Sequence, residues 1–313
     1  MLAYYIHDLS PFLVEFGNGI GLRWYGLAYV LAFAAAYGLF VHLARKGYSD
    51  IRPSEVSDFI TGTALFGVIL GGRLGYMLFY DWTNFSQDPL IFFKFWDGGM
   101  SSHGGILGVA IFTFIYARRK KIPWLNVGDS IVVSTPIGLF LGRCANFING
   151  ELYGRTTTVP WAVQFPKDLY YAPPETAHAL ITQTSEINPD WNTIGTILDH
   201  VGGSADLHRI LGEILTPRHP SQIYEGILEG CLLFTLMWIL RTRFRLPNGV
   251  LTGVFFIAYA LLRIAGEMFR EPDAPLTAGL TRGQFLSLFM VLMGLGFLAG
   301  SKWASTWAPK FRS

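Results

Sequence analysis

Long apolar runs separated by shorter polar segments dominate the hydropathy pattern of the chain. Seven of these runs are long enough for a helix that crosses the hydrocarbon core of a bilayer, which takes about 20 residues. We expect these helices near residues 24–44, 57–80, 99–117, 127–147, 223–241, 249–269 and 284–303. The pattern therefore predicts an all-α, polytopic membrane protein with seven transmembrane helices.

The longest segment without such a run covers residues 148–222. Prolines are scattered through it, at Pro160, Pro166, Pro173, Pro174, Pro189, Pro217 and Pro220. We interpret this segment as a small outward-facing cap of mixed secondary structure. The chain then divides into an N-terminal membrane part (residues 1–147, four spans), the cap (148–222) and a C-terminal membrane part (223–313, three spans).

Basic residues cluster after the first, third, fifth and seventh of these runs. The clusters are Arg45, Lys46 and Arg52; Arg118, Arg119, Lys120 and Lys121; Arg241, Arg243 and Arg245; and Lys302, Lys310 and Arg312. Because cytoplasmic loops carry an excess of Lys and Arg, we expect the N-terminus outside and the C-terminus in the cytoplasm. The first 22 residues lack Lys and Arg and contain Asp8 and Glu15, which is not the pattern of a cleavable signal peptide.

Composition agrees with the membrane interpretation. The 313 residues are 51% hydrophobic and 15% charged, with a mean hydropathy of +0.36, which is too apolar for a soluble protein of two domains. A net charge of only +2 gives no indication of nucleic acid as a partner. The two cysteines, Cys144 and Cys231, both lie in apolar runs, so they indicate neither a disulfide framework nor a metal cluster. No metal or soluble cofactor is expected.

Several polar side chains interrupt the apolar runs at one depth. With the predicted orientation, all of them fall in the outward half of the bilayer: Tyr25, Arg73, His103, Arg143, Arg263 and Glu267. An arginine at the centre of a membrane helix costs about 2.5–3.5 kcal/mol, so it usually has a counter-charge or an anionic ligand. We expect a single polar cavity that opens toward the outer leaflet.

Two arginines from different spans could form a phosphate clamp in this cavity. A guanidinium group matches phosphate oxygens and stays charged. Arg143 and Asn146 share one helix face, and Tyr259, Arg263 and Glu267 share another. The alternative is that Arg263 and Glu267 form an internal pair that only locks two helices together. Glu225 and Glu229, four residues apart on the fifth span, could equally pair with one of the arginines.

The remaining candidates each have a functional and a structural interpretation. His103 lies among glycines and could act as a general base, since imidazole titrates near neutral pH, or could hydrogen-bond a neighbouring helix. Arg73 could belong to the site or could only anchor the second span. Glu151 follows the fourth span and could belong to the site or be a solvated carboxylate. A cation beside Cys144 makes it a candidate nucleophile. The glycines Gly67, Gly71, Gly75, Gly104 and Gly108 predict close helix packing.

Five ordered sequence blocks resemble those of the prolipoprotein diacylglyceryl transferase family. They are GRCANFINGE at 142–151 with Gly154, RWYG at 23–26, DGGMS at 97–101 followed by HGG at 103–105, RHPSQ at 218–222, and the run from Arg263 through Pro272 and Asp273. The blocks extend from the first span to the end of the sixth. Two features depart from the family pattern: the cysteine at position 144, and a longer segment at about 166–210.

The resemblance implies a seven-span enzyme of the bacterial inner membrane with a periplasmic cap. It implies transfer of an sn-1,2-diacylglyceryl group from phosphatidylglycerol to the lipobox cysteine of a prolipoprotein signal peptide, with a thioether formed and glycerol 1-phosphate released. This is the first step of lipoprotein maturation. His103 is then a candidate for the base that deprotonates the substrate thiol, and Arg143 for the lipid-binding residue. The residues expected around the lipid are Asn146, Tyr25, Tyr259, Glu151, Gly154, Arg263 and Glu267.

Three other functions fit parts of the sequence. An intramembrane serine protease could use Ser101 or Ser102 with a histidine, although neighbouring helical residues point about 100° apart. A lipid or anion transporter usually has paired halves with broken helices, which this sequence lacks. A thioester acyltransferase would need Cys144 as its nucleophile. Replacing Cys144 with Ala would separate this last possibility from the transferase hypothesis.

Overall fold

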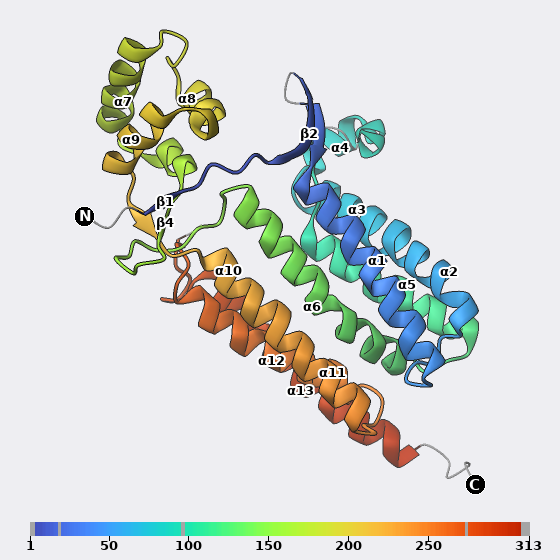
Figure 1. The fold of residues 1–313 in the computed structure, drawn as a ribbon. Coiled ribbons are helices and arrows are strands. Elements are labelled where there is room, and N and C mark those ends of the chain that lie inside the picture. Colours follow the sequence, from blue (N-terminus) through green and yellow to red (C-terminus); the bar gives the residue numbers. More distant parts are fainter. Residues whose placement is uncertain (1–3, 18–19, 95–97, 273–274, 308–313) are drawn as a thin grey trace. The chain divides into compact units, whose positions relative to one another are not determined.

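The computed structural model describes residues 4–17, 20–94, 98–272 and 275–307, with only the backbone of 302–307 (Figure 1). Asp97 and Asp273 of the sequence blocks, with Lys310 and Arg312, lie outside this part. Five long helices are single elements: α1 (Trp24–Arg45), α5 (Ser102–Lys120), α6 (Trp124–Ile148), α12 (Val250–Glu267) and α13 (Arg282–Trp307). Two more are continuous helices of several elements: α2 (Val56–Gly62), η2 (Thr63–Leu70) and α3 (Gly71–Phe79) form one, and α10 (Ser221–Glu225), η7 (Gly226–Leu232) and α11 (Leu233–Arg243) form the other. Of these, η2 and η7 are π-helical stretches inside continuous helices.

Six helices among the described residues are long and apolar enough to cross a membrane. They are Trp24–Arg45, Pro53–Phe79, Trp124–Ile148, Ser221–Arg243, Val250–Glu267 and Arg282–Ser301. Each coincides with a predicted span, which confirms a mostly helical, multi-span membrane protein. The predicted span near 99–117 corresponds to α5, which is not among the six. The hydropathy of α5 is lowered by Arg118, Arg119 and Lys120 in its last turn.

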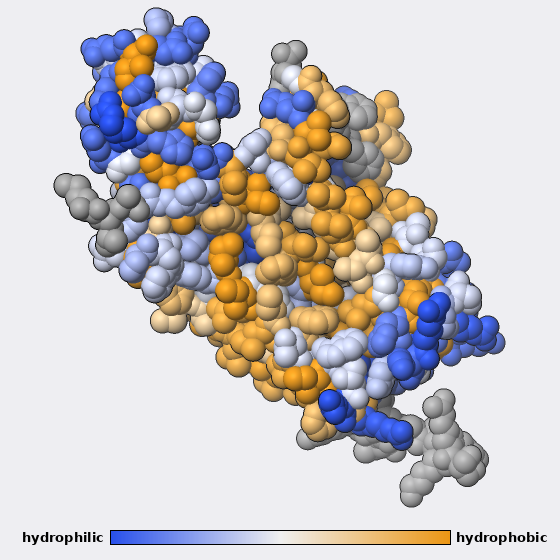
Figure 2. All heavy atoms as spheres, in the orientation of Figure 1, coloured by the Kyte–Doolittle hydropathy of each residue, from blue (hydrophilic) through white to orange (hydrophobic). Residues whose placement is uncertain are grey.

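The long helices expose many large apolar side chains. Examples with more than half of the residue surface exposed are Val30, Phe66, Ile106, Leu261 and Leu292. On the face shown in Figure 2, hydrophobic residues cover the long helices, whereas hydrophilic ones predominate on α7 to α9. A water-soluble protein seldom exposes such extensive apolar surface. These faces are therefore suited to contact with lipid chains.

The chain forms two compact units, which we describe separately. Unit 1 contains Met1–Ala32, Pro136–Leu233 and Ile257–Leu292, and unit 2 contains Phe33–Thr135, Phe234–Phe256 and Met293–Ser313. In unit 2, α3 packs on α5 through glycines. A Cβ atom at Gly75 would lie 2.5 Å from the Cα atom of Gly104, and one at Gly71 would lie 2.8 Å from that of Gly108. The close packing predicted from the glycine spacing is confirmed.

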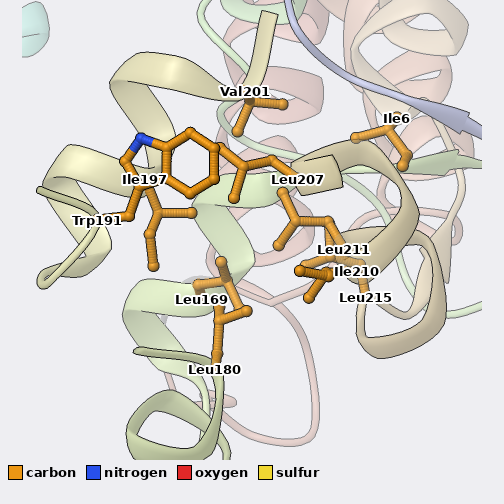
Figure 3. Packing of buried hydrophobic residues seen from close by; sticks show 10 residues of the cluster. All are labelled: Ile6, Leu169, Leu180, Trp191, Ile197, Val201, Leu207, Ile210, Leu211 and Leu215. Carbon is orange, nitrogen blue, oxygen red and sulfur yellow. The ribbon is translucent and has the colours of Figure 1, made fainter. Parts of the chain in front are cut away.

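Residues 163–218 of unit 1 form a helical insertion with its own hydrophobic core. It contains η5 (Pro166–Tyr171), α7 (Pro174–Ile187), α8 (Ile194–His200), η6 (Val201–Gly203) and α9 (Ala205–Ile214). Thr193 caps α8 and Ser204 caps α9, each by accepting a hydrogen bond from a backbone N–H of the first turn. The core in Figure 3 consists of Ile6, Leu169, Leu180, Trp191, Ile197, Val201, Leu207, Ile210, Leu211 and Leu215.

Short strands correct the all-α expectation. Strand β4 (Val163–Gln164) pairs in parallel with β1 (Tyr5–Ile6) and antiparallel with β5 (Pro217–Arg218). Strands β2 (Phe12–Gly17) and β3 (Ile20–Arg23) form a hairpin directly before α1. Outside the long helices, α4 (Trp82–Gln87), η1 (Pro53–Glu55) and η3 (Pro89–Phe93) complete the structure. Strands β1, β4 and β5 have two residues each and carry no periodic signal, so hydropathy alone did not predict them.

Candidate active site

The run at 142–151 forms the end of helix α6 and the turn after it. Gly150 has a positive φ of 61°, and its N–H donates to the carbonyl of Phe147 at 2.8 Å. The N–H of Glu151 donates to the carbonyl of Asn146 at 3.1 Å. Together these two bonds form a Schellman motif, in which a left-handed glycine closes the helix. The motif turns the chain so that Glu151 returns to Asn146.

A side-chain hydrogen bond strengthens this return. The Asn146 amide donates to Oε1 of Glu151 at 2.8 Å, and the same amide lies 3.5 Å from the hydroxyl of Tyr25 in α1. Asn146 is buried, with 5% of its surface exposed. Glu151 is therefore held by specific donors and is not simply a solvated carboxylate at the start of the loop.

The loop after Glu151 is fixed by the start of helix α10. Gln222 donates its side-chain amide to the carbonyl of Glu151 at 2.7 Å, and the Ser221 hydroxyl donates to the carbonyl of Leu152 at 2.9 Å. A Cβ atom at Gly154 would lie 2.5 Å from the carbonyl oxygen of Phe269. Gly154, expected near the lipid, therefore occupies a close backbone contact where no larger residue fits without a shift.

Helix α10 and the π-helical η7 carry two buried carboxylates. Glu225 and Glu229 are both 0% exposed. Gly230, next to Glu229, would bring a Cβ atom within 2.6 Å of the Cβ atom of Phe140, so the absence of a side chain lets α6 come close. A π-helical turn alters which side chains share a face, and such turns are frequent at functional sites.

These carboxylates bridge Arg143 of α6 and Arg263 of α12. Arg143 lies 3.0 Å from Oε2 of Glu225 and donates to Oε2 of Glu229 at 3.1 Å. Arg263 donates to Oε1 of Glu225 at 2.9 Å and to Oε1 of Glu229 at 3.2 Å. Arg263 also donates to Glu267, one helical turn away. We call these five residues, together with Arg270, the arginine–glutamate cluster.

The formal charges in the cluster balance, with three arginines and three glutamates. The side chains of Arg143 and Arg263 are each 14% exposed. A guanidinium group has five N–H donors, which is more than the two contacts of Arg143 with Glu225 and Glu229 require. The carboxylates thus hold both arginines in place.

Two other residues belong to this region. The Tyr259 hydroxyl interacts electrostatically with Glu229, Arg263 and Arg143. Arg270, which the sequence analysis did not select, is 5% exposed and lies 3.6 Å from Oε1 of Glu225. Arg270 lies four residues after Gly266, and this spacing gives no signal in the hydropathy pattern. A sequence feature that could have pointed to Arg270 as a site residue is its position three residues after Glu267.

His103 and Arg73, which were expected in the same cavity, belong to unit 2. Arg73 is 2% exposed and its guanidinium donates to the backbone carbonyls of Ile91, Phe92, Lys94, Gly98 and Gly99. It therefore organises the segment before α5. His103 is the second residue of α5 and is exposed. Ser101, considered as a protease nucleophile, caps this helix by accepting a hydrogen bond from the Gly104 N–H at 3.1 Å.

The cysteines are free thiols in this structure. Cys144 is half-buried on α6, next to Arg143, and Cys231 is exposed on η7. Among the residues that the structure describes, no group of three or more His, Cys, Asp or Glu side chains is arranged to hold a metal ion.

We predict that Glu225→Gln lowers the thermal stability of the protein much more than Glu271→Gln does. Removing one partner of a buried ion pair costs about 3–5 kcal/mol, and Glu225 contacts two cluster arginines at 3.0 Å or less. Glu271 is 49% exposed and pairs with Arg218 at 3.3 Å, and exposed pairs contribute about 0–1 kcal/mol. Unfolding in detergent, followed by tryptophan fluorescence, measures both. Equal shifts for the two variants would contradict the structural role given to Glu225.

Comparison with known proteins agrees with the resemblance of the sequence blocks. The pattern of the prolipoprotein diacylglyceryl transferase family matches residues 11–299. A phosphatidylglycerol–prolipoprotein diacylglyceryl transferase of Coxiella burnetii is 40% identical over 297 residues, covering 94% of this chain and 95% of that protein. The enzyme of the same name from Shigella boydii is 38% identical, covering 99% of both. The chain therefore belongs to the prolipoprotein diacylglyceryl transferase family.

Proposed function

We propose that the arginine–glutamate cluster is where this transferase binds the phosphate of phosphatidylglycerol. As a family member, the protein transfers a diacylglyceryl group from phosphatidylglycerol to prolipoproteins during lipoprotein maturation. The observation that supports the location is that Arg143 and Arg263, from α6 and α12, share the same two buried carboxylates. Two guanidinium groups held in this way are preorganised for an anionic lipid.

The reaction forms a carbon–sulfur bond and breaks a carbon–oxygen bond. The thiolate of the substrate cysteine attacks the glycerol carbon that carries the phosphate, and glycerol 1-phosphate leaves with the bonding electrons. Negative charge grows on the leaving phosphate in the transition state, so fixed cations beside it lower the barrier. The substrate supplies the sulfur nucleophile, so the enzyme needs none of its own.

Each of the surrounding residues has a proposed part. Glu225, Glu229 and Glu267 hold the two arginines. Asn146 and Glu151, linked by the turn at the end of α6, face the polar part of the lipid together with Tyr25 and Tyr259. Gly154 permits the close backbone packing that keeps this loop in place. The support for these roles is the set of hydrogen bonds and ion pairs described above.

His103 is the proposed general base for the thiol of the lipobox cysteine. A free thiol with a pKa of about 8.5 is only a few per cent ionised at neutral pH, so a positioned base increases the reactive fraction. The start of α5 is well fixed, since the Ser101 N–H donates to the carbonyl of Gly72 at 2.9 Å and Gly104 packs against Gly75. An exposed imidazole on this rigid helix end is suited to accept a proton.

We further propose a seven-span topology in the bacterial inner membrane, with α5 as the additional span. With 19 residues, α5 has the length to cross the hydrocarbon core at 1.5 Å per residue. It exposes apolar side chains along its length, at Ile106, Leu107, Ile111, Phe114 and Ile115. In this topology the basic clusters lie on the cytoplasmic side with the C-terminus, and the N-terminus and the helical insertion lie outside, the insertion as part of a periplasmic cap.

Purified protein in phosphatidylglycerol liposomes should convert a lipobox peptide to its diacylglyceryl thioether and release glycerol phosphate. We expect Arg143→Gln to lower kcat by roughly 10²–10³, the usual effect of removing one donor that stabilises transition-state charge. Mass spectrometry of the peptide and an assay of glycerol phosphate measure both products. A peptide with Ser in place of Cys should give no product.

Two further variants distinguish a loss of activity from a loss of folding. Arg143→Gln combined with Glu229→Gln keeps the formal charges of the cluster balanced, and we expect it to fold yet remain inactive. Arg209→Gln, at an exposed position on α9, should behave as the wild type. Near-normal turnover by a folded Arg143→Gln protein would refute the phosphate-binding role.

For the proposed base, we expect His103→Gln to reduce kcat by roughly 10²–10⁴, the usual contribution of general base catalysis. The KM for phosphatidylglycerol should change little, since the lipid phosphate is assigned to other residues. Wild-type kcat should depend on pH through the protonation of the base, and the variant should lose this dependence. His178→Gln on the exposed side of α7 is the control. The same pH profile in His103→Gln and wild type would exclude His103 as the base.

Cysteine labelling tests the topology. In a background with Cys144 and Cys231 replaced by Ala, a cysteine at Glu186 of α7 should react with an impermeant maleimide in spheroplasts. A cysteine at Arg119, at the end of α5, should react only after lysis. Labelling of both positions from outside would contradict the topology. Activity of the cysteine-free background would also argue against Cys144 as a nucleophile.

A further inference from the structure

The N-terminal strand runs between the helical insertion and the end of α6. Strand β1 pairs in parallel with β4, and the His7 N–H continues the pairing by donating to the carbonyl of Gln164 at 2.8 Å. Successive side chains of a strand point to opposite sides. Ile6 enters the core of the insertion, where 8% of it is exposed, and His7 points the other way.

His7 makes its contacts with the turn that ends α6. Its Nε2 atom lies 2.7 Å from the carbonyl oxygen of Phe147. Its ring packs edge-on against Phe147 at 5.5 Å between ring centres and tilted against Phe165 at 5.4 Å. Only 7% of His7 is exposed. A Cβ atom at Gly150 would lie 3.0 Å from the imidazole, so the ring lies directly on this glycine.

The chemistry of the imidazole suits this position. Burial lowers the pKa of His7 below its ordinary value of 6.5, so the ring is neutral at pH 7. A carbonyl oxygen only accepts, so the one N–H of the neutral ring lies on Nε2 and donates to Phe147. The same carbonyl accepts the Gly150 N–H at 2.8 Å. His7 therefore provides a second bond to one of the carbonyls of the Schellman motif.

We infer that His7 is a positioning residue for the Asn146–Glu151 turn of the active site. It holds the carbonyl of Phe147 and covers Gly150, and so it restricts the turn that brings Glu151 to Asn146. The strand on which it sits is anchored by Ile6 in the insertion. The helical insertion thus supports the site through β1. This inference rests on the proposed function in assigning Asn146 and Glu151 to the lipid site.

The test compares His7→Ala, which removes the ring, with His7→Gln, whose side-chain amide can donate from a place similar to Nε2. We expect His7→Ala to lower kcat by about ten- to hundredfold, in line with the effect of small misplacements near a reacting centre. His7→Gln should restore kcat to within about threefold of wild type, since it keeps a donor to the Phe147 carbonyl. His178→Ala on α7 is the matched control and should be unaffected.

Hydrogen exchange supplies a readout that does not depend on activity. The amides of Gly150 and Glu151 donate within the turn, so they should exchange faster in His7→Ala than in wild type, and at near wild-type rates in His7→Gln. Unchanged exchange and unchanged kcat in His7→Ala would overturn the inference. An equal loss of kcat and melting temperature in both His7 variants would also overturn it, because a general folding defect would then explain the loss.

Asn146→Ala separates this inference from the proposed function. If a folded Asn146→Ala protein keeps normal kcat while His7→Ala still speeds exchange at Gly150, the turn is positioned by His7 but the site assignment is wrong. If Asn146→Ala is inactive and His7→Ala retains both kcat and slow exchange, the site assignment stands and the role of His7 is refuted.

Discussion

The burial of charge in an apolar environment is the constraint on which the site depends. Glu225 and Glu229 are fully buried between arginines of two other helices. An unpaired ion at such a place costs several kcal/mol, so the helices must approach closely enough for every charge to find a partner. Gly230 and Gly266 provide the space, since a Cβ atom at Gly230 would lie 2.6 Å from Cβ of Phe140 and one at Gly266 would lie 3.1 Å from Cγ of Glu225.

The cluster and the α6 turn combine two kinds of rigidity. The cluster fixes cations through ion pairs that reach across three helices. The turn fixes Asn146 and Glu151 through its backbone geometry. This geometry requires a positive φ at position 150, which glycine adopts readily. Arg143 lies one helical turn before the Schellman motif, so the two systems are joined within a single helix. A lipid phosphate and its polar neighbours would therefore meet groups that need little rearrangement.

The sequence predicted two kinds of feature: the apolar runs of the membrane-spanning helices, and the charged residues that a lipid environment disfavours. Six spans are long apolar runs, and Arg143 and Arg263 are conspicuous because a membrane seldom tolerates them. The seventh segment was harder to define, since the basic end of α5 belongs to the helix itself. The four-residue spacing of Glu225 and Glu229 showed a shared face but not a partner. Which arginine they meet is decided by tertiary packing.

Other features had no local signal. The two-residue strands depend on partners far along the chain, and His7 resembles any polar residue of an N-terminal tail. Resemblance marked Gly154 as a lipid-site residue, whereas its steric reason is the carbonyl of Phe269 more than 100 residues later. The π-helical turns depend on how helices pack and have no distinct sequence pattern. Contacts of this kind are decided by the complete fold.

The pairing of β1 with β4 has a consequence for the order of folding. Tyr5 pairs with Val163 and Ile6 with Gln164, so the first strand has no partner until α1 to α6 and the strand after them have been synthesised. Joining segments so distant in sequence is entropically costly and comes late. Strand β1 is thus synthesised well before its partner and is among the last elements to be fixed. The turn at Gly150, which His7 contacts, can therefore be completed only after β4 in the second half of the chain has been synthesised.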